Sequence, residues 1–336
     1  MTIRAERDLS DTQYVESPHD GVFLGEYVFN QNELITKLSR QSYAGAWSVD
    51  QFDWSTPVHY DDVVPVRDSY PRMPRFHPGN TWDKETWQQY EIANLRYLLS
   101  QVLHAEQLGV ILGGVLCVSG EDWDTKQFGT SLVIDEARHA ETFKRYLDRI
   151  GGVYPLEVEL YSVIEEAMTA REWDKSYLLG HVLLEGLSLG TLGHVSRTAQ
   201  DPLLDDVLRN VMRDEARHVA YGAGQLPSML KELSSQELLE RQELLAHSVQ
   251  TLLNRLTPVV VAEEYGIDPV QYRRAMRMSP QQRRLENRLF AHVGPLCARL
   301  GLLDANDSWL RKEFEKMSLL SLSDEIAEEA AADLSW

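Results

Sequence analysis

A five-residue sequence, Asp-Glu-Ala-Arg-His, occurs twice in the chain, at residues 135–139 and 214–218. In each copy a glutamate and a histidine are three residues apart. An α-helix turns about 100° per residue, so this spacing places the two side chains within about 60° of each other on one face. A carboxylate and an imidazole held in this way can bind one metal ion. Each copy is therefore a candidate half of a metal site.

A single glutamate precedes each copy by the same distance. Glu106 lies thirty residues before Glu136, and Glu185 lies thirty residues before Glu215. The pattern forms a weak internal repeat of two helical hairpins. Four helices that carry Glu, Glu-x-x-His, Glu and Glu-x-x-His are what a dinuclear carboxylate site in a four-helix bundle requires. The predicted metal ligands are Glu106, Glu136, His139, Glu185, Glu215 and His218.

The surroundings of the single glutamates favour bound metal over a purely structural role. Glu106 and Glu185 lie in apolar stretches, where an unpaired carboxylate would carry a large desolvation cost. Two divalent ions would balance four carboxylates, with both imidazoles neutral. The ligands are rich in oxygen and include no sulfur, which favours iron or manganese over structural zinc or copper. The predicted cofactor is two iron ions, or a manganese–iron pair.

The aspartate and the arginine of each copy are candidates for orienting the metal ligands and balancing their charge. A metal-bound histidine normally donates its second N–H to a carboxylate. Asp135 and Asp214 are the expected acceptors, and Arg138 and Arg217 would neutralise them. The alternative is that the two arginines make ordinary surface ion pairs.

Further residues near the ligands could contact a substrate. His181 lies four residues before Glu185, on nearly the same helix face. It could be a seventh ligand, a base beside the ligands, or a core histidine bound to a backbone carbonyl. Small residues about one turn from the ligands, with apolar residues near them, could leave an enclosed cavity or could serve helix packing. The small residues are Gly109, Ala140 and Ser188, and the apolar residues are Phe143, Leu189 and Val219.

The elements that must position these residues are helical, and no strand signal appears. The apolar periodicity and capping residues predict core helices at about 83–118, 122–150 and 156–170, a helix that carries Glu185 and ends near Gln200, and one that starts at Asp201-Pro202 and stops before Pro227. We expect an all-α fold with a bundle at residues 81–227. A proline- and aromatic-rich arm at 1–80, with an early helix near 30–42, would wrap it. Accessory helices in 228–336 are expected at about 235–256, 268–277, 280–300, 308–317 and 323–334.

Composition limits the location and the partners. The formal net charge of −19 repels nucleic acid and anionic membrane surfaces. We find no run of eighteen apolar residues and no apolar signal region at the N-terminus, so neither a transmembrane helix nor secretion is expected. The two cysteines, Cys117 and Cys297, are 180 residues apart with no Cys-x-x-Cys motif, which suits a reducing cytoplasm.

The six ligand positions and the repeated motif resemble the ferritin-like diiron carboxylate superfamily over residues 84–226. Within it, the bacterial multicomponent monooxygenase hydroxylases and the ribonucleotide reductase small subunit with its oxidase-like relatives are the most similar. The resemblance implies that each aspartate pairs with the histidine of the other copy. It also implies O2 activation at a diiron or manganese–iron site, with electrons from a separate reductase. We expect a homodimer, with a reductase or ferredoxin as the electron donor.

At several positions the chain differs from each of these relatives, and no single subfamily fits. Phe143 stands where reductase subunits usually have a radical tyrosine, so Tyr177 and Tyr221 are the alternative radical sites. Gly180 replaces the crosslinking tyrosine of ligand-binding oxidases, and Leu189, next to Ser188, replaces a threonine of the monooxygenases. Arylamine N-oxygenases have a histidine at the position of Val211. The expected function is an oxygenase or oxidase that hydroxylates, N-oxygenates or desaturates a small organic substrate. The alternative is a radical-generating subunit.

Overall fold

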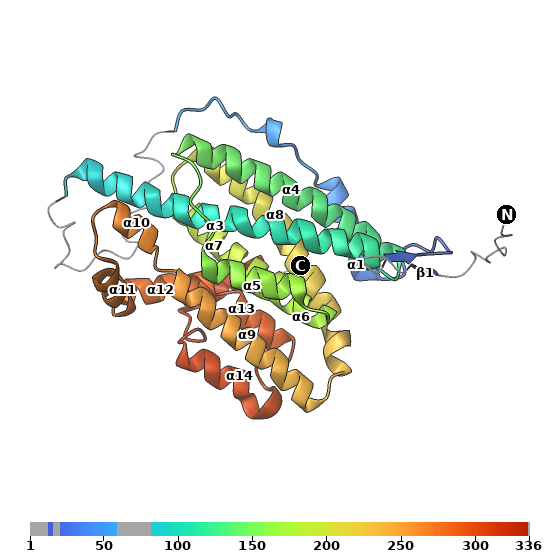
Figure 1. The fold of residues 1–336 in the computed structure, drawn as a ribbon. Coiled ribbons are helices and arrows are strands. Elements are labelled where there is room, and N and C mark those ends of the chain that lie inside the picture. Colours follow the sequence, from blue (N-terminus) through green and yellow to red (C-terminus); the bar gives the residue numbers. More distant parts are fainter. Residues whose placement is uncertain (1–12, 16–20, 59–81, 335–336) are drawn as a thin grey trace, which may run out of the picture.

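The four helices that carry the predicted ligands run alongside one another (Figure 1). The computed structural model describes residues 13–15, 21–58 and 82–334. The core helices are α3 (Lys84–Ser119), α4 (Trp123–Arg149), the continuous run of α6 (Trp173–Tyr177), η3 (Leu178–Leu184) and α7 (Glu185–Thr198), and α8 (Pro202–Lys231). Helix α5 (Val158–Thr169) links the two hairpins. The all-α, ferritin-like prediction is confirmed.

Aspartate caps start three of the core helices where the sequence predicted them. Asp83 accepts a hydrogen bond from the backbone N–H of Thr86 at the start of α3. Asp122 does the same for Thr125 at the start of α4. Asp201 caps α8, and Pro202 occupies its first turn. These caps satisfy N–H groups that have no partner within the helix.

The predicted end of α8 before Pro227 is wrong, because the helix continues to Lys231. Proline removes one helical hydrogen bond and usually breaks a helix interior. Here Leu226 and Leu230 are buried on either side of it. Their packing against the core offsets the lost hydrogen bond and keeps the last turn helical.

Most of the accessory helices lie below the bundle in Figure 1. Helix α9 begins with the capping box of Ser234 and Glu237. The predicted helix at 280–300 is in fact two helices, and α10 was not predicted at all. The backbone at residues 306–308 is left-handed, so the right-handed part of α14 begins after Ser308, close to the predicted start. The accessory helices are α9 (Ser235–Arg255), α10 (Val259–Glu264), α11 (Pro269–Arg277), α12 (Pro280–Leu289), α13 (Val293–Arg299), α14 (Ala305–Lys316) and α15 (Asp324–Asp333).

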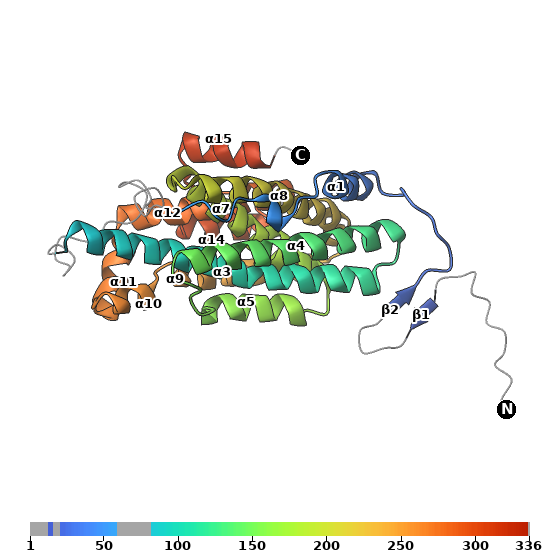
Figure 2. The same cartoon turned by 90° about the horizontal axis from the view of Figure 1, so that it is seen from above.

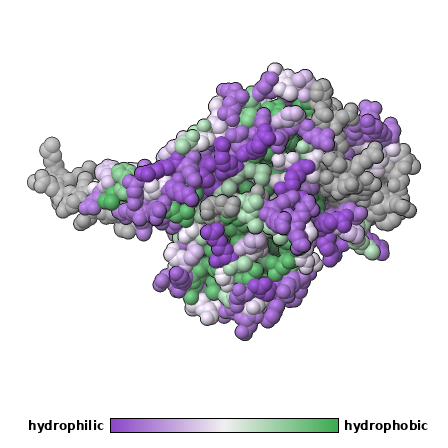
Figure 3. Space-filling view, turned by 180° about the vertical axis from the view of Figure 1, so that it is seen from behind, coloured by the Kyte–Doolittle hydropathy of each residue, from purple (hydrophilic) through white to green (hydrophobic). Residues whose placement is uncertain are grey.

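Figure 2 shows α5 and α15 on opposite sides of the bundle. The largest cluster of buried apolar side chains includes residues of α3, α4 and α8 together with residues of α9, α12, α13 and α14. Bundle and accessory helices thus share one core. The division of the chain at residues 80 and 227 stays a prediction. The face seen from behind in Figure 3 shows a band of hydrophilic residues with hydrophobic residues visible below it.

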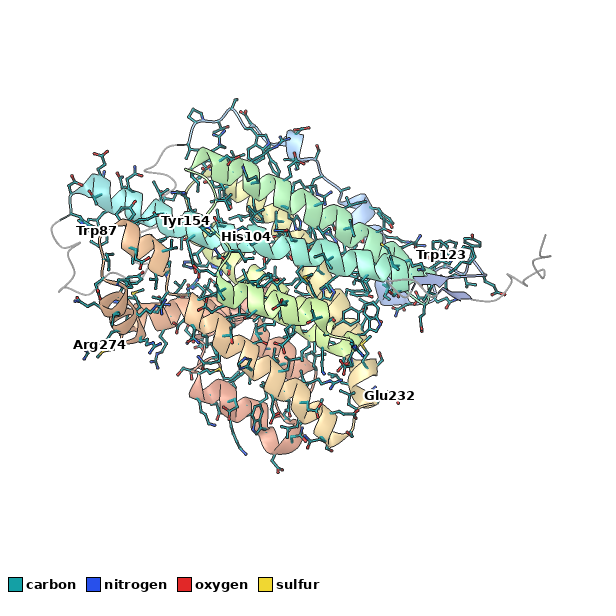
Figure 4. All side chains as sticks on the ribbon, in the orientation of Figure 1. Trp87, His104, Trp123, Tyr154, Glu232 and Arg274 are labelled. Carbon is teal, nitrogen blue, oxygen red and sulfur yellow. The ribbon has the colours of Figure 1, made fainter. Side chains whose placement is uncertain are left out.

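The described part of the N-terminal arm contains more structure than predicted. Two three-residue strands, β1 (Gln13–Val15) and β2 (Gly21–Phe23), pair antiparallel beyond one end of the bundle (Figure 2). Helix α1 (Glu33–Ala44) and the short η1 (Val49–Gln51) follow. Asp124 fastens the arm to α4, since its carboxylate accepts backbone N–H groups of residues 30–32 at 2.7–2.8 Å. Trp123, labelled in Figure 4, stacks on Tyr27 beside it. The arm prolines from Pro65 to Pro78, with Tyr60 and Tyr70, lie outside the described residues.

Two helical stretches are long and apolar enough, by length and composition alone, to cross a membrane: α3 and the run Trp173–Thr198. In the second, 94% of the most apolar window is buried inside the protein, as in a core helix. In α3 the share is 39%. Both helices carry a predicted metal ligand on a face that packs within the bundle. The expectation of no transmembrane helix therefore stays a prediction.

Candidate dinuclear metal centre

The structure brings all six predicted ligands together in the middle of the bundle. Their side chains form two sets in which the ligand atoms lie within 4.8 Å of one another. Glu136 and Glu215 belong to both sets. The first set adds Glu106 and His139, and the second adds Glu185 and His218. Each set would hold one metal ion with a carboxylate and an imidazole of its own, and Glu136 and Glu215 could serve both ions.

Each ligand comes from the helix that the sequence assigned to it. Helix α3 supplies Glu106, and α4 and α8 each supply a Glu-x-x-His pair on one face. Glu185 is the first residue of α7, directly after the π-helical segment η3, and its backbone N–H bonds to the carbonyl of Gly180. Short π-helical segments occur frequently at functional sites. The sequence pattern did not reveal this segment.

The distances within the cluster suit ligands around common ions. Nδ1 of His218 lies 3.0 Å from Glu136 Oε1, and Nδ1 of His139 lies 3.3 Å from Glu106 Oε2. Adjacent ligands of an ion with bonds of about 2.1 Å stand roughly 3 Å apart. Glu215 Oε2 is buried and makes no hydrogen bond. The residues present therefore fit a pair of divalent ions with Nδ1 as the histidine donor.

Burial and mutual repulsion perturb the ligand groups of the protein itself. Burial, then the charge of Glu136, raises the pKa of Glu106 well above its ordinary value. Burial would lower the pKa of both histidines, but their carboxylate neighbours raise it well above the usual range. Burial would also raise the pKa of Glu136, yet hydrogen bonds with Glu106 and the positive charge of His218 bring it well below normal. Bound protons thus offset the negative charge of this cluster, which two cations would otherwise neutralise.

The second ring nitrogens of the histidines point to the predicted aspartates. His139 Nε2 lies 3.2 Å from Asp214 Oδ2, and His218 Nε2 lies 3.5 Å from Asp135 Oδ2. Each aspartate therefore contacts the histidine of the other motif, as the resemblance implies. Such carboxylates orient the imidazole and fix which nitrogen carries the proton.

Arg138 and Arg217 each pair with both aspartates. Arg138 Nη2 contacts Asp135 and lies 3.0 Å from Asp214. Arg217 Nη2 lies 2.7 Å from Asp214 and 3.2 Å from Asp135. All four side chains are at most 10% exposed. The alternative of ordinary surface pairing for the arginines is therefore wrong.

Trp47 of the N-terminal arm also contacts these side chains, and sequence reasoning missed it. Its indole N–H donates to Asp214 Oδ2 at 2.7 Å. The ring stacks on His139 with centroids 6.1 Å apart, and the Arg138 guanidinium lies 4.4 Å from its centroid. Ser42, also from the arm, donates to Asp135 at 3.0 Å. The irregular pattern of the arm held no signal for these contacts.

His181 lies beside the ligand sets and outside both of them. Its Nδ1 is 3.0 Å from both carboxylate oxygens of Glu185. A core histidine bound to a backbone carbonyl is therefore the wrong interpretation. The position agrees with the alternative of a base next to the ligands. Its Nε2 is buried without a hydrogen-bond partner.

A cavity of about 20 Å³ adjoins the cluster, which is room for one water-sized molecule. Gly109 and Ser188 line it as predicted, and the Ser188 hydroxyl has no hydrogen-bond partner. The lining does not include the other predicted residues, Ala140, Phe143, Leu189, Val219 and His181. It consists of Ala105, Glu106, Leu108, Gly109, Leu112, Glu136, Gly180, Leu184, Glu185, Ser188 and Glu215.

Gly109 borders the cavity and also lies directly against a predicted ligand. A Cβ atom at this position would lie 2.4 Å from the carboxylate carbon of Glu136. Glycine therefore makes room for a metal ligand, and a larger residue would displace that ligand before it filled the cavity. Gly180 is different, because a Cβ there would meet only the end of the Leu112 side chain, at 2.5 Å.

Comparison with known proteins agrees with this geometry. The family model of the p-aminobenzoate N-oxygenase AurF matches residues 29–301. The chain belongs to the AurF family. A search of curated protein sequences found no match. Among solved structures, an R2-like ligand-binding oxidase with an aerobically reconstituted Mn/Fe cofactor has a TM-score of 0.52 and 15% identity, over 81% of this chain and 93% of that one. A tyrosine-to-phenylalanine variant of such an oxidase gives 0.53 and 15%, over 82% and 94%.

Membership of the AurF family confirms the predicted assignment to the ferritin-like dinuclear-metal oxygenases and oxidases. The chain departs from the arylamine N-oxygenase pattern at Val211, which is fully buried in an apolar cluster on α8. No histidine is available from that turn. His181, on the other hairpin, is the additional imidazole next to the ligands.

We expect metal binding to release protons and to strengthen as pH rises. The pKa of His139, His218 and Glu106 is raised in the metal-free protein, so these groups hold protons that a metal must displace. Anaerobic titration with Fe²⁺ or Mn²⁺ in weakly buffered solution would measure the released protons, and repetition at several pH values would give the affinity. An affinity independent of pH would contradict this charge assignment.

Proposed function

We propose that this member of the AurF family N-oxygenates a small aromatic amine at a diiron or manganese–iron centre. The observation that carries the proposal is the pair of ligand sets that share Glu136 and Glu215. When bound, the metal pair supplies O2 activation and Lewis acidity. Four carboxylates and two neutral imidazoles would leave two divalent ions electrically neutral in the buried site.

The side chains around the centre have distinct tasks in this proposal. Asp135 and Asp214 hold the histidine rings with Nδ1 towards the metals and keep the proton on Nε2. Arg138 and Arg217 balance the charge of the aspartates. His181 can hold a proton next to Glu185, and the Ser188 hydroxyl can donate a hydrogen bond into the cavity. We assign His181 and Ser188 to proton handling and substrate contact.

The cavity lining indicates the kind of substrate. Its non-ligand residues are apolar or small, apart from Ser188, and it contains no lysine or arginine. A carboxylate such as that of p-aminobenzoate would find no cation there, and burial of an unpaired charge is costly. A neutral aromatic amine is therefore favoured. The present volume admits one water-sized molecule, so the lining side chains must move for substrate to enter.

The test is turnover of a series of amines. Protein loaded with iron, or with manganese and iron, and chemically reduced would be exposed to ¹⁸O2 with neutral anilines or with p-aminobenzoate. Mass spectrometry should find ¹⁸O on the nitrogen of the neutral amines and little product from the acid. Detection of ¹⁸O on a ring carbon would instead assign ring hydroxylation to the protein. No incorporation, despite full metal loading and O2 consumption, would contradict the oxygenase proposal.

Gly180→Val is expected to abolish amine turnover while metal content stays unchanged. Gly180 lines the cavity, and a Cβ atom at this position would meet only the flexible end of Leu112. Gly114→Val is the matched control, because a Cβ at Gly114 on α3 meets nothing within 4 Å. Metal analysis and turnover of both variants check the prediction. Equal turnover in the two variants would place substrate elsewhere.

We also propose a homodimer with an external electron donor, in the cytoplasm. Apolar side chains are exposed on the face formed by α3 and α4, where Ile111, Val115 and Ile134 are 39–54% exposed. A second copy of this face is the proposed partner, since apolar patches of this kind mark interfaces. Electrons would come from a reductase or ferredoxin. Both cysteines are free, which supports a reducing compartment. Sedimentation analysis of the wild type and of Ile134→Lys tests the dimer.

A further inference from the structure

A chain of aromatic side chains leads from the metal-ligand cluster towards the surface on the side of α6. The ring of His181, which contacts Glu185, lies 5.4 Å from the ring of Tyr177 and 5.6 Å from that of Tyr221. Tyr177 lies 5.6 Å from Trp173. The histidine and both tyrosines are buried, whereas Trp173 is 37% exposed. Adjacent rings are thus in contact over the whole distance.

The tyrosine hydroxyls belong to a chain of interacting hydroxyl groups that ends at a carboxylate. Thr125 has one hydroxyl proton and donates it to Asp122 at 2.8 Å. The Thr125 side chain also interacts with the Tyr221 hydroxyl. The Tyr177 and Tyr221 hydroxyls are hydrogen-bonded to each other, with the two oxygens 3.1 Å apart and either one able to donate. A proton that leaves Tyr177 can pass along this chain to the carboxylate of Asp122, which is partly exposed.

Packing alone does not require these hydroxyls. Phe128 stacks on Tyr221 with centroids 3.9 Å apart, in the same buried cluster, so a phenyl ring fits this environment. Burial raises the pKa of Tyr177 to about 12 and raises that of Tyr221 as well, so both phenols stay protonated. A buried pair of protonated phenols beside a proton acceptor chain has the arrangement needed to give up an electron and a proton together.

We propose that Tyr177, Tyr221 and Trp173 form a relay that carries an oxidising equivalent from the metal centre to the protein surface when no amine is oxidised. The inference rests on the proposed function, since it requires a centre that reacts with O2. Without substrate, such a centre would oxidise the side chains beside it. Tyrosine and tryptophan are the readily oxidised aromatic side chains, and the relay offers them in order from the core to the surface.

Electrons and protons balance in this relay. One electron passes from Tyr177 or Tyr221 to the oxidised centre, and the phenolic proton moves through Thr125 to Asp122. One electron then passes from Trp173 to the tyrosyl radical, which regains its proton by the reverse path. An external one-electron reductant, such as ascorbate or a thiol, restores the exposed Trp173. Each passage lowers the oxidation state of the centre by one.

The first test follows radicals in the metal-loaded, reduced protein mixed with O2 in the absence of amine. Freeze-quench electron paramagnetic resonance should detect a tyrosyl radical in the wild type. Trp173→Phe should prolong that signal several-fold, because the next donor is missing. The Tyr177→Phe, Tyr221→Phe double variant should abolish it. Trp87→Phe, a tryptophan in the separate aromatic cluster at the start of α3, is the matched control and should leave the signal unchanged.

Protein damage is a second readout on the same samples. After repeated substrate-free exposure to O2, peptide mass spectrometry should find oxidised Trp173 in the wild type. In the double variant, oxidation should move to residues at the cluster, with faster loss of metal. Metal content and O2 consumption are recorded throughout. Failure to load metal or consume O2 would contradict the proposed function, whereas normal loading and consumption with no tyrosyl signal and unchanged damage would overturn the relay.

A metal-free experiment tests the relay independently of the centre. A ruthenium photo-oxidant attached at the exposed position of Glu172, in a Glu172→Cys, Cys117→Ser background, would oxidise Trp173 by light. The radical should move to tyrosine in the protein with Tyr177 and should remain on tryptophan in the Tyr177→Phe variant. A radical that stays on tryptophan in both proteins would show that the rings are not coupled and would overturn the proposal.

Discussion

Glu136→Gln is expected to reduce the metal content from about two ions per chain to nearly none. Glu136 belongs to both ligand sets, so its loss removes a donor from each ion at once. The amide that replaces it carries no charge, which leaves three carboxylates against two divalent ions in a buried site. Metal analysis by mass spectrometry after anaerobic reconstitution measures the effect, and amine turnover should fall with it.

The metal-free Glu136→Gln protein should nevertheless remain folded. Removing one of four buried carboxylates relieves part of the burial and repulsion that raise the pKa of Glu106. Added metal should raise the melting temperature of the wild type and leave the variant unchanged. Glu141→Gln is the matched control on the exposed side of α4. Two metals per chain in Glu136→Gln would refute the bridging role.

Asp214→Asn should weaken metal binding by roughly 10–100-fold without unfolding the bundle. Asp214 is fully buried and accepts hydrogen bonds from His139, Arg217 and Trp47 at once. Burial would raise its pKa, but His139 and Arg217 hold that pKa far below the ordinary value, so the group is anionic. Asparagine cannot balance the arginines and can accept through only one oxygen. The His139 ring would lose its fixed orientation.

Competition of the protein with a chelator for Mn²⁺ gives the affinity of Asp214→Asn. Asp206→Asn, an exposed position on the same helix, is the control and should bind metal like the wild type. The histidine that Asp214 orients belongs to the first ligand set, so one of the two ions should be lost before the other. Equal affinity of Asp214→Asn and wild type would mean that the aspartate serves only the ion-pair network.

The predicted ligands, supporting aspartates and helix starts depended on local rules, and these predictions agree with the structure. Glu and His three residues apart share a helix face in any α-helix, so both motifs had to present a pair. Asp83, Asp122 and Asp201 cap helices because their side chains bond to N–H groups two or three residues ahead. The charge balance of carboxylates and histidines likewise depends on residue type alone. Sequence is sufficient where the physical cause lies within a few residues.

Other features depend on contacts between segments distant in the chain. Trp47 reaches Asp214 across 167 positions, and no periodicity in the arm indicated which ring would meet the cluster. The residues of the π-helical segment before Glu185 do not differ in type from those of an ordinary buried helix. The segment packs against α8 and α9, and these tertiary contacts accommodate its extra residue. The continuation of α8 past Pro227 depends in the same way on buried Leu226 and Leu230.

By itself, the sequence determined the fold class, six side chains that converge as a candidate ligand set, and the oxygen-rich composition of that set. Only the tertiary structure decided that Gly109 makes room for Glu136, that the cavity is lined by Gly180 and Ser188, and that His181 stands between the ligands and two tyrosines. The reason is one of distance. Helix faces and caps follow from spacings of three or four residues, whereas a cavity is the space left after four helices have packed, and small differences in their separation determine which side chains border it.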